Sequence, residues 1–292
     1  MGVKTDNNKI KMVGSERPQS SAGVQYHIQC RKGDVSRYVL LPGDPARVPR
    51  IAEFFDEAKQ VAFHREYNTF TGKINGVPIS STSSGIGGPA LNIAVEELAQ
   101  IGADTFIRVG TCGGIQPGLS AGDLVISSAA VRLNDASIDY VDLGYPASAS
   151  HEVVLALIEA AEELGLRYHV GITASTNTFF CGQGRPGFNG FWQGAKHDNL
   201  VGDLQNARVL NFEMEAATLF TLCNLFGLRA GTVCAVVANR VEKKFATPEV
   251  YERAEKDTAR VAVKAVEILA SRDAEATKAG KRWWYPGISG KA

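Results

Sequence analysis

The sequence predicts an α/β fold in which helices cover both faces of a central sheet. Short runs rich in β-branched residues alternate along the chain with amphipathic runs of helical period. Several of the short runs are apolar throughout, as strands are when helices cover both faces of a sheet. No repeat and no linker interrupts this alternation. We therefore expect residues 23–292 to form a single domain that follows a flexible, polar arm at residues 1–22.

The order of the predicted elements supports this fold class. The predicted strands are the β-branched or apolar runs Tyr38–Leu41, Pro78–Thr82, Thr105–Val109, Leu124–Ala129, Val170–Ala174 and Thr232–Ala238. The predicted helices share an apolar face at helical spacing, and they are Pro89–Ile101, Glu152–Leu164, Glu213–Phe226 and Pro248–Ala270. A glycine that can stop a helix follows each of the first three, and Pro248 suits the first turn of the last.

Two longer segments break the alternation and are predicted to be functional loops. Leu133–Ser150 is polar and rich in Asp, whereas Gly182–Gly202 is rich in Gly and carries aromatic residues. Loops of this length are uncommon inside a compact domain, and they usually serve as lids or binding loops.

Composition excludes several classes of function. Lys+Arg and Asp+Glu both number 31, so no net charge attracts nucleic acid or an anionic membrane surface, and anion binding must be local. No stretch is long and apolar enough to span a bilayer, and the N-terminal residues lack the apolar run of a secretory signal. The five cysteines are odd in number and form no CxxC pair, which favours a reducing compartment. These features predict a cytoplasmic protein.

The segment LLPGDPAR, Leu40–Arg47, has the features of an anion site. An apolar strand leads through Gly43, which allows close approach of the backbone, into the start of a helix. Backbone N–H groups at a helix start bind anions, and we expect Arg47, about one turn into the helix, to add a guanidinium. A plain tight turn explains the same residues equally well, because Gly-Asp-Pro is good turn chemistry.

The segment FIRVGTCGG, Phe106–Gly114, ends an apolar strand with a charged residue. Arg108 in this position is costly unless it meets an anion or a carboxylate. Ligands of open α/β sheets bind at the carboxyl ends of strands, where Arg108 and the hydroxyl of Thr111 lie. The alternative is a structural ion pair. The spacing GTCGG is not the GxGxxG of a dinucleotide fingerprint.

Two further segments carry charge at positions that chemistry could use. In NFEMEAATLF, Glu213 and Glu215 either open a helix, where its dipole favours negative charge, or accept hydrogen bonds from vicinal sugar hydroxyls. In HREYNTFTG, His64 and the charged Arg65 and Glu66 lie in a strand-like run, and a solvated strand face explains them as well.

Taken together, these segments resemble the uridine phosphorylases of the nucleoside phosphorylase-I family. The resemblance runs from about Tyr26 to Leu269 in the family's order, and its pieces are PGDPAR, HRE, SSGIGGPALNIAVEELAQIG, FIRVGTCGGIQPGLSAGDLVI, TFFCGQGR, NFEMEA and VVANR. It implies a three-layer α/β sandwich around a mixed, partly barrel-like sheet. It also implies a homodimer or a dimer-based oligomer whose active sites are shared between subunits.

The resemblance also assigns roles to residues. Phosphate would be held by Gly43, Arg47, Arg108 and Thr111, together with Arg65 of the partner subunit. Ribose would be held by Met214 and Glu215, with Glu213 close by, and by His27 of the partner subunit. Uracil would be held by Gln183 and Arg185, with Phe179 stacked on it, Val237 lining the pocket and Arg240 supporting Arg185.

The base-binding residues favour uracil over a purine as the leaving group. Purine-cleaving relatives place an Asp after the corresponding strand, but Asn239 stands here and cannot supply a carboxyl proton. Gln183 offers a donor and an acceptor to the imide edge of uracil, and Arg185 can stabilise charge that builds on a carbonyl oxygen. We expect phosphate-dependent cleavage of uridine, with Arg108, Thr111, Glu215 and Arg185 as the catalytic residues. The alternatives are a purine nucleoside phosphorylase or nucleosidase on this scaffold, or a non-catalytic nucleoside-binding protein.

The resemblance implies inorganic phosphate as co-substrate and no cofactor. Bacterial members of the family can hold a monovalent cation between subunits, using the Glu of HRE and a Ser after GIGGP. Glu66 is present here, but Ala90 takes the Ser position, so such a site would lack one ligand or be built differently.

Overall fold

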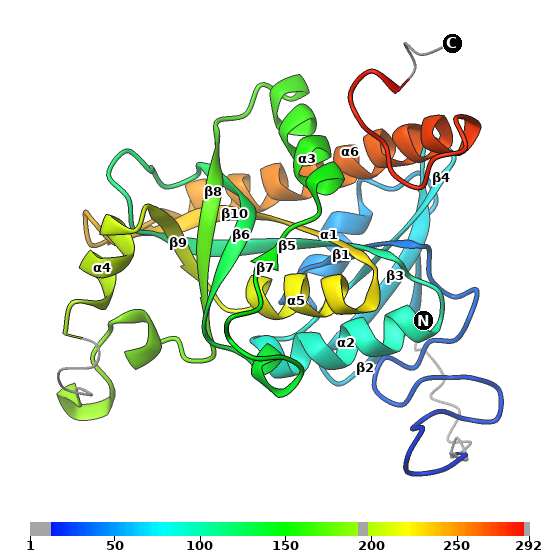
Figure 1. Cartoon of the computed structure of the whole chain (residues 1–292), viewed down its shortest axis with the longest axis horizontal. Helices are drawn as coiled ribbons and strands as arrows, with labels where there is room; N and C mark the ends of the chain where they lie inside the picture. Colours follow the sequence, from blue (N-terminus) through cyan, green and yellow to red (C-terminus); the bar gives the residue numbers. More distant parts are fainter. Residues whose placement is uncertain (1–12, 192–197, 289–292) are drawn as a thin grey trace.

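The computed structural model describes residues 13–191 and 198–288, and it shows a mixed α/β fold with one large sheet (Figure 1). In these residues the strands are β1 Tyr38–Leu41, β2 Lys59–His64, β3 Tyr67–Ile74, β4 Val77–Thr82, β5 Thr105–Gly114, β6 Leu124–Asn134, β7 Ala147–Ser148, β8 Tyr168–Thr176, β9 Val209–Glu213, β10 Arg229–Asn239 and β11 Lys244–Phe245. The α-helices are α1 Arg47–Ala52, α2 Gly88–Gln100, α3 His151–Glu163, α4 Leu200–Asn206, α5 Ala216–Phe226 and α6 Pro248–Lys278.

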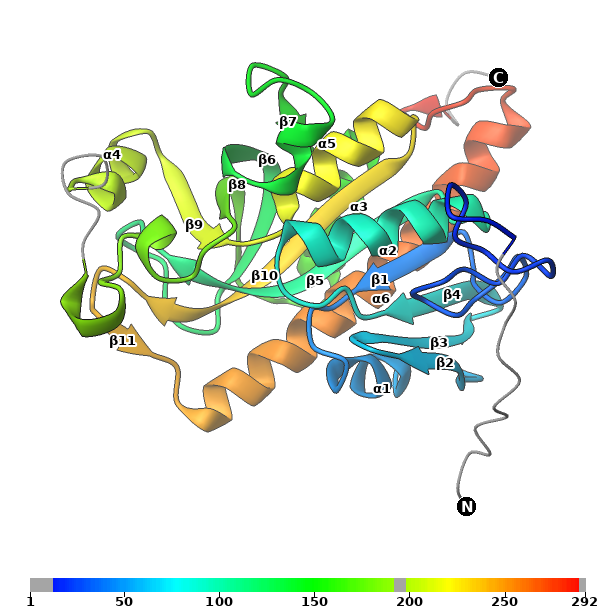
Figure 2. The same ribbon diagram turned by 90° about the horizontal axis from the view of Figure 1, so that it is seen from below.

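Helices cover both faces of the sheet, as the apolar runs of the sequence predict. The side chains of β1 alternate between the two faces, so Leu40 packs with α1, α3 and α6, whereas Val39 and Leu41 pack with α2 and α5. In β5, Ile107 and Phe106 divide between the same two layers. Figure 2 shows α6 running beneath the strands and α2 and α5 on the other side of them. This arrangement confirms the three-layer sandwich.

Part of the sheet closes on itself. The strands β10, β6, β8, β9 and β5 are neighbours in that order, and β10 pairs again with β5. The β10–β5, β6–β8 and β8–β9 pairs are parallel, whereas the β10–β6 and β5–β9 pairs are antiparallel. The prediction of a mixed, partly barrel-like sheet is therefore confirmed. The open arm of the sheet continues from β5 through β1, β4, β3 and β2.

The structure differs from the predicted boundaries at places that later form the site. The strand predicted to end at Val109 continues to Gly114, because residues of β5 after Val109 pair with β10 and β9. The helix predicted to begin at Glu213 begins at Ala216, and Glu213 is instead the last residue of β9. Arg47 is the first residue of α1 and does not lie one turn into it.

Other predicted segments have more structure than expected. Helix α6 extends past the predicted end at Ala270 to Lys278. The polar loop Leu133–Ser150 contains a short 3₁₀ turn and β7, and the loop Gly182–Gly202 leads into α4. Residues 192–197 of that loop, and residues 1–12 of the predicted arm, lie outside the described residues. In the described part of the chain, no helix has the length and apolar character needed to cross a membrane.

The fold brings the motifs together at one edge of the sheet. Strands β1 and β10 both run parallel to β5, and Leu41 and Thr232 are the register partners of Arg108. The carboxyl ends of these strands therefore meet, as is usual for ligand sites of α/β sheets. The antiparallel β9 places Glu213 close to the same edge.

Candidate active site

A cavity of about 730 Å³ opens at the carboxyl ends of β1, β5 and β10. Most of the residues that the sequence predicts for the site line it, and they are Gly43, Arg47, Glu66, Arg108, Thr111, Phe179, Gln183, Arg185, Glu213, Met214, Glu215 and Val237. Segments that are far apart in the sequence thus converge on one space. His27, Arg65 and Arg240 are not among the residues that line the cavity.

Arg108 is a buried cation held between two carboxylates. Its Nε donates to Glu213 Oε2 at 2.8 Å, and its Nη2 lies 2.6 Å from Glu215 Oε2. Burial alone would lower the pKa of Arg108, but the two carboxylates raise it, so the guanidinium stays charged. The close approach depends on Gly110, because a Cβ there would lie 2.9 Å from the Arg108 Cζ. The predicted ion pair is therefore present, and it lines a cavity.

Glu213 connects the strand to the helix that follows. Its Oε2 accepts hydrogen bonds from the backbone N–H groups of Glu215 and Ala216 at 2.8 and 2.9 Å, at the positive start of α5. The Ser175 hydroxyl donates to its Oε1 and accepts from the N–H of Ala217. Glu213 thus supports the helix start, as one reading of NFEMEA predicts, and it also holds Arg108.

Glu215 bridges Arg108 to the start of α2. Its Oε1 accepts the N–H of Gly87 at 2.5 Å, and its Oε2 faces Arg108. Burial raises the pKa of this carboxyl above its usual range, and Glu213 adds to the rise while Arg108 opposes it. A carboxylate with its acceptor atoms at a cavity wall can accept hydrogen bonds from ligand hydroxyls. Met214 lies on the same wall.

Arg47 provides a second buried cation beside the turn predicted in LLPGDPAR. The turn is present, because Asp44 Oδ1 accepts the N–H of Ala46 at 2.8 Å. Arg47 Nε pairs with Glu255 on α6 at 3.0 Å. Its Nη2 is buried, and it has no hydrogen-bond partner in residues 13–191 and 198–288. Burial lowers the pKa of Arg47, Glu255 opposes that change, and the nearby Arg108 adds to it. The ion pair with Glu255 thus leaves one donor of Arg47 without an acceptor in these residues.

The other end of the cavity carries the side chains of the predicted base site. Arg185 Nη1 donates to the carbonyl oxygen of Phe179 at 2.7 Å and to Gln183 Oε1 at 2.5 Å. The guanidinium also lies 4.0 Å from the centroid of the Phe179 ring. Arg240 supports this group through the backbone, because its Nη1 donates to the carbonyl oxygen of Gln183 at 3.0 Å. Burial, and then the charge of Arg240, lower the pKa of Arg185 to about 10.

Asn239 is held in the chain reversal after β10. Its Nδ2 donates to the carbonyl oxygen of Leu119 at 3.0 Å, and its Oδ1 accepts the N–H groups of Val241 and Glu242 at 3.0 and 2.9 Å. Asn239 is also not among the cavity-lining residues. At the place where a purine-cleaving relative would have an acid, this chain has a structural amide.

The residues expected from a partner subunit lie away from the cavity of their own chain. His27 Nδ1 is 2.7 Å from Glu97 Oε1, and the Arg65 guanidinium lies 5.9 Å from the centroid of the Tyr26 ring. His64 Nδ1 contacts the carbonyl oxygen of His27 at 2.9 Å, so the two segments are neighbours. The structure thus groups His27 with the HRE motif. His27 and Arg65 do not line the cavity of the same chain, whereas Glu66 of this motif does.

Sequence reasoning missed several residues of the site. Tyr251 and Phe245 line the cavity, and Ser175 and Glu255 hold residues that do so. Ser175 and Glu255 lie outside the motifs that predict the site. They come from β8 and α6, and only the packing of these elements brings them to the cavity.

Comparison with known proteins agrees with this geometry. The family model described as the phosphorylase superfamily matches residues 37–270, and the chain therefore belongs to this superfamily. A uridine phosphorylase of Thermococcus kodakarensis is 62% identical over 96% of this chain and 99% of its own. A uridine phosphorylase of Escherichia coli is 40% identical over 84% of this chain and 97% of its own. A guanosine phosphorylase of Halorubrum lacusprofundi is 37% identical over 74% of this chain and 84% of its own.

Proposed function

We propose that this chain is a uridine phosphorylase, an enzyme that uses inorganic phosphate to cleave uridine into uracil and ribose 1-phosphate. One observation carries the proposal. A single cavity holds buried arginines at one end and the Gln183–Arg185 pair at the other, with the Glu213–Glu215 segment also in its wall. The relatives named uridine phosphorylase support the same activity.

The phosphate lies at the arginine end of the cavity in this proposal. Arg47 and Arg108 offer charged donors, Thr111 adds a hydroxyl, and Gly43 leaves room for the phosphate beside the backbone. The support is that Arg47 and Arg108 are both buried cations that line this cavity, where a phosphate would bring the opposite charge. Arg65 of the partner subunit completes the site.

The ribose lies over the Glu213–Glu215 segment. Glu215 accepts hydrogen bonds from the ribose hydroxyls, Met214 packs beside them, and Glu213 keeps Arg108 and the start of α5 in place. His27 of the partner subunit reaches the 5′ end of the sugar. A homodimer, or an oligomer built from dimers, follows from this arrangement, because His27 and Arg65 lie outside the cavity of their own chain.

The uracil lies between Phe179 and Val237. Gln183 matches the donor and acceptor of the imide edge, and Arg185 stabilises the negative charge that develops on the departing base. Arg240 holds the backbone of Gln183 in position. Burial and Arg240 lower the pKa of Arg185 in this site, which disfavours the charged form of the guanidinium. Negative charge on the departing uracil would favour the charged form again.

The chemistry is a displacement at C1′ of the ribose. As the glycosidic bond stretches, the sugar gains positive character, and a phosphate oxygen held by Arg47 and Arg108 forms the new bond at C1′. The bonding electron pair leaves with uracil, and Arg185 and Gln183 accommodate its charge. Positioning and electrostatic stabilisation supply most of the rate, with little proton transfer. Phosphate is the co-substrate, and the proposed reaction uses no cofactor.

An interface cation is not part of this proposal. Glu66, the one predicted ligand that is present, lines the cavity, and Gly85 and Ala90 lie close to it. In the described part of the chain, no group of three His, Cys, Asp or Glu side chains has a metal-binding arrangement.

We place the enzyme in the cytoplasm, in line with the composition of the chain.

Cleavage of a purine nucleoside is the second candidate, because one relative is named a guanosine phosphorylase. The test is release of free base from uridine, inosine and guanosine, each with and without inorganic phosphate. We expect uridine to be cleaved fastest and only when phosphate is present. Faster cleavage of either purine nucleoside, or release of uracil without phosphate, would contradict the proposal. Binding of phosphate without any turnover would instead indicate a non-catalytic nucleoside-binding protein.

A further inference from the structure

Glu255 lies in α6 and contacts the arginine to which the proposed function assigns phosphate. Its carboxylate forms an ion pair with Arg47 Nε at 3.0 Å and accepts a hydrogen bond from Arg50 Nη1 at 2.9 Å. Arg47 lines the active-site cavity and also a second cavity of about 510 Å³ beside α1 and α6, whereas Glu255 lines only the second one. Glu255 therefore contacts Arg47 without lining the cavity proposed for phosphate.

The contact with Glu255 uses one edge of a rigid group. A guanidinium is planar, and its donors point in fixed directions, so an ion pair at Nε restricts the orientation of the whole plane. Arg47 is almost completely buried, and its Nη2 has no partner among residues 13–191 and 198–288. Among these residues, Arg47 is thus held at Nε by Glu255, and its Nη2 has no acceptor.

The charges of the three side chains leave Arg47 effective as a cation. Glu255 by itself would neutralise Arg47, which would weaken the attraction of an anion. Arg50 contacts the other oxygen of the carboxylate, so the group of Arg47, Glu255 and Arg50 carries a net positive charge. Because the side chain of Arg50 is 60% exposed, water screens its charge, whereas the charge of Arg47 is buried at the cavity.

We propose that Glu255 is a positioning residue for phosphate binding: its ion pair with Nε holds the Arg47 guanidinium in the orientation that binds the phosphate. It acts through Arg47 and does not touch the substrate. The inference rests on the proposed function, because it needs phosphate at Arg47, and it extends that function to a residue outside every motif that predicts the site.

Positioning and simple electrostatics predict opposite results for removal of this carboxylate. A negative charge near a phosphate site repels phosphate, so its loss would by itself tighten phosphate binding. A positioning residue gives the reverse, because a guanidinium that loses its fixed orientation binds the anion less well. The direction of the change in phosphate affinity therefore separates the two roles.

The experiment measures steady-state kinetics and phosphate binding for Glu255→Ala and Glu255→Gln. For Glu255→Ala we expect the KM for phosphate to rise about tenfold, the effect of losing one charge-assisted hydrogen bond, with the KM for uridine nearly unchanged. Glu255→Gln keeps one carbonyl acceptor for Arg47, so we expect a smaller rise, which is a partial rescue by the conservative variant. If the Ala variant fails to fold, the Gln variant carries the test.

Asp257→Asn is the matched control. Asp257 lies two residues further along α6, pairs with Arg260 at 3.2 Å and is not among the residues that line either cavity. It should leave both KM values unchanged. In an Arg47→Met background, Glu255→Ala should have no further effect on phosphate binding, because the residue through which it acts is gone.

Isothermal calorimetry with inorganic phosphate alone separates failure of this inference from failure of the proposed function. A tenfold weaker phosphate affinity of Glu255→Ala supports the positioning role even if uridine proves not to be the substrate. An unchanged or tighter phosphate affinity overturns it even if uridine is cleaved. An equal rise in both KM values, with a lower melting temperature, also overturns it, since that result indicates a purely structural role.

Discussion

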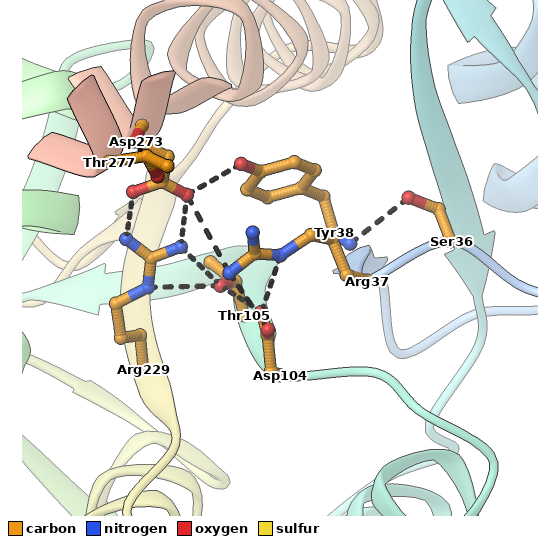
Figure 3. A network of polar contacts seen from close by, with 8 residues as sticks. All are labelled: Ser36, Arg37, Tyr38, Asp104, Thr105, Arg229, Asp273 and Thr277. Carbon is orange, nitrogen blue, oxygen red and sulfur yellow. Dashed lines mark hydrogen bonds and ion pairs between the residues drawn. The ribbon is translucent and has the colours of Figure 1, made fainter. Parts of the chain in front are cut away.

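Buried arginines lie at both ends of the same parallel strands, and they differ in whether all of their nitrogen atoms have protein partners. At the amino ends, Arg229 donates to Asp273 at 2.7 Å from both Nη1 and Nη2, and its Nε and Nη2 donate to the Thr105 hydroxyl (Figure 3). At the carboxyl ends, Arg47 has a buried nitrogen without a partner in the described residues. The first group joins β5 and β10 to α6, and the second lines a cavity.

The difference shows how a structural arginine can be told from a binding one. Further contacts complete the Arg229 group, because the Tyr38 hydroxyl donates to Asp273 at 2.6 Å and Arg37 pairs with Asp104. Burial by itself would raise the pKa of Asp273, but hydrogen bonds from Arg229 and Tyr38 lower it below its usual value. An arginine whose three nitrogen atoms all have protein partners, such as Arg229, contributes to stability. A buried arginine that lines a cavity and has a nitrogen without a partner in the described residues, such as Arg47, is a candidate for ligand binding.

The largest expected effect is on catalysis, from Arg47→Met. Loss of one charged donor to the reacting anion should lower kcat/KM for phosphate by about 10²–10³-fold. Stability should change little, because Arg50 still pairs with Glu255 and a buried unpaired donor is removed. Steady-state kinetics and thermal unfolding of the same preparation test both statements. A large fall in melting temperature with retained phosphate affinity would show that Arg47 stabilises the fold and does not bind phosphate.

The opposite result, lower stability with nearly unchanged catalysis, is expected of Arg229→Met. Among the described residues, removal of Arg229 leaves the Asp273 carboxylate with Tyr38 and Arg37 as partners, so the free energy of unfolding should fall by about 3 kcal/mol. Because the group lies at the amino ends of the strands, kcat and both KM values should stay close to those of the parent protein. Urea unfolding followed by circular dichroism measures the first effect. A tenfold loss of kcat/KM in the folded variant would show that the two ends are not independent.

A smaller effect, confined to the active-site end, is expected of Gly110→Ala. The added Cβ would lie 2.7 Å from Cys234 Sγ and 2.9 Å from the Arg108 guanidinium, so Arg108 must move. Overpacking of this kind costs about 1–3 kcal/mol, and we expect a roughly tenfold lower kcat/KM for phosphate. Gly113→Ala is the matched control in the same strand, because its Cβ would meet its nearest atoms at ordinary contact distances of 3.6 Å or more. Equal losses in both variants would argue against a specific displacement of Arg108.

The fold class, and most of the residues that line the candidate site, can be predicted from the sequence alone. The pattern of apolar residues shows which segments of the chain are buried. Strand β1 accordingly has the predicted bounds, and the central parts of helices α2 and α3 lie within the predicted ranges. The motifs LLPGDPAR, FIRVGTCGG and NFEMEA identified residues that line one cavity, although each motif also allowed a plain structural reading. Local residue types limit what a segment can do, and they leave open which partner it meets.

The partners of those residues depend on the tertiary structure and cannot be predicted from the motifs. Glu213 ends a strand because β9 pairs with β5 and β8, which helix propensity in NFEMEAATLF does not report. Arg108 meets two carboxylates that are more than a hundred residues away, and Arg47 meets Glu255 from the last helix. Such contacts depend on how sheet and helices close around the site. The free donor of Arg47 is therefore visible in the fold and not in the motif.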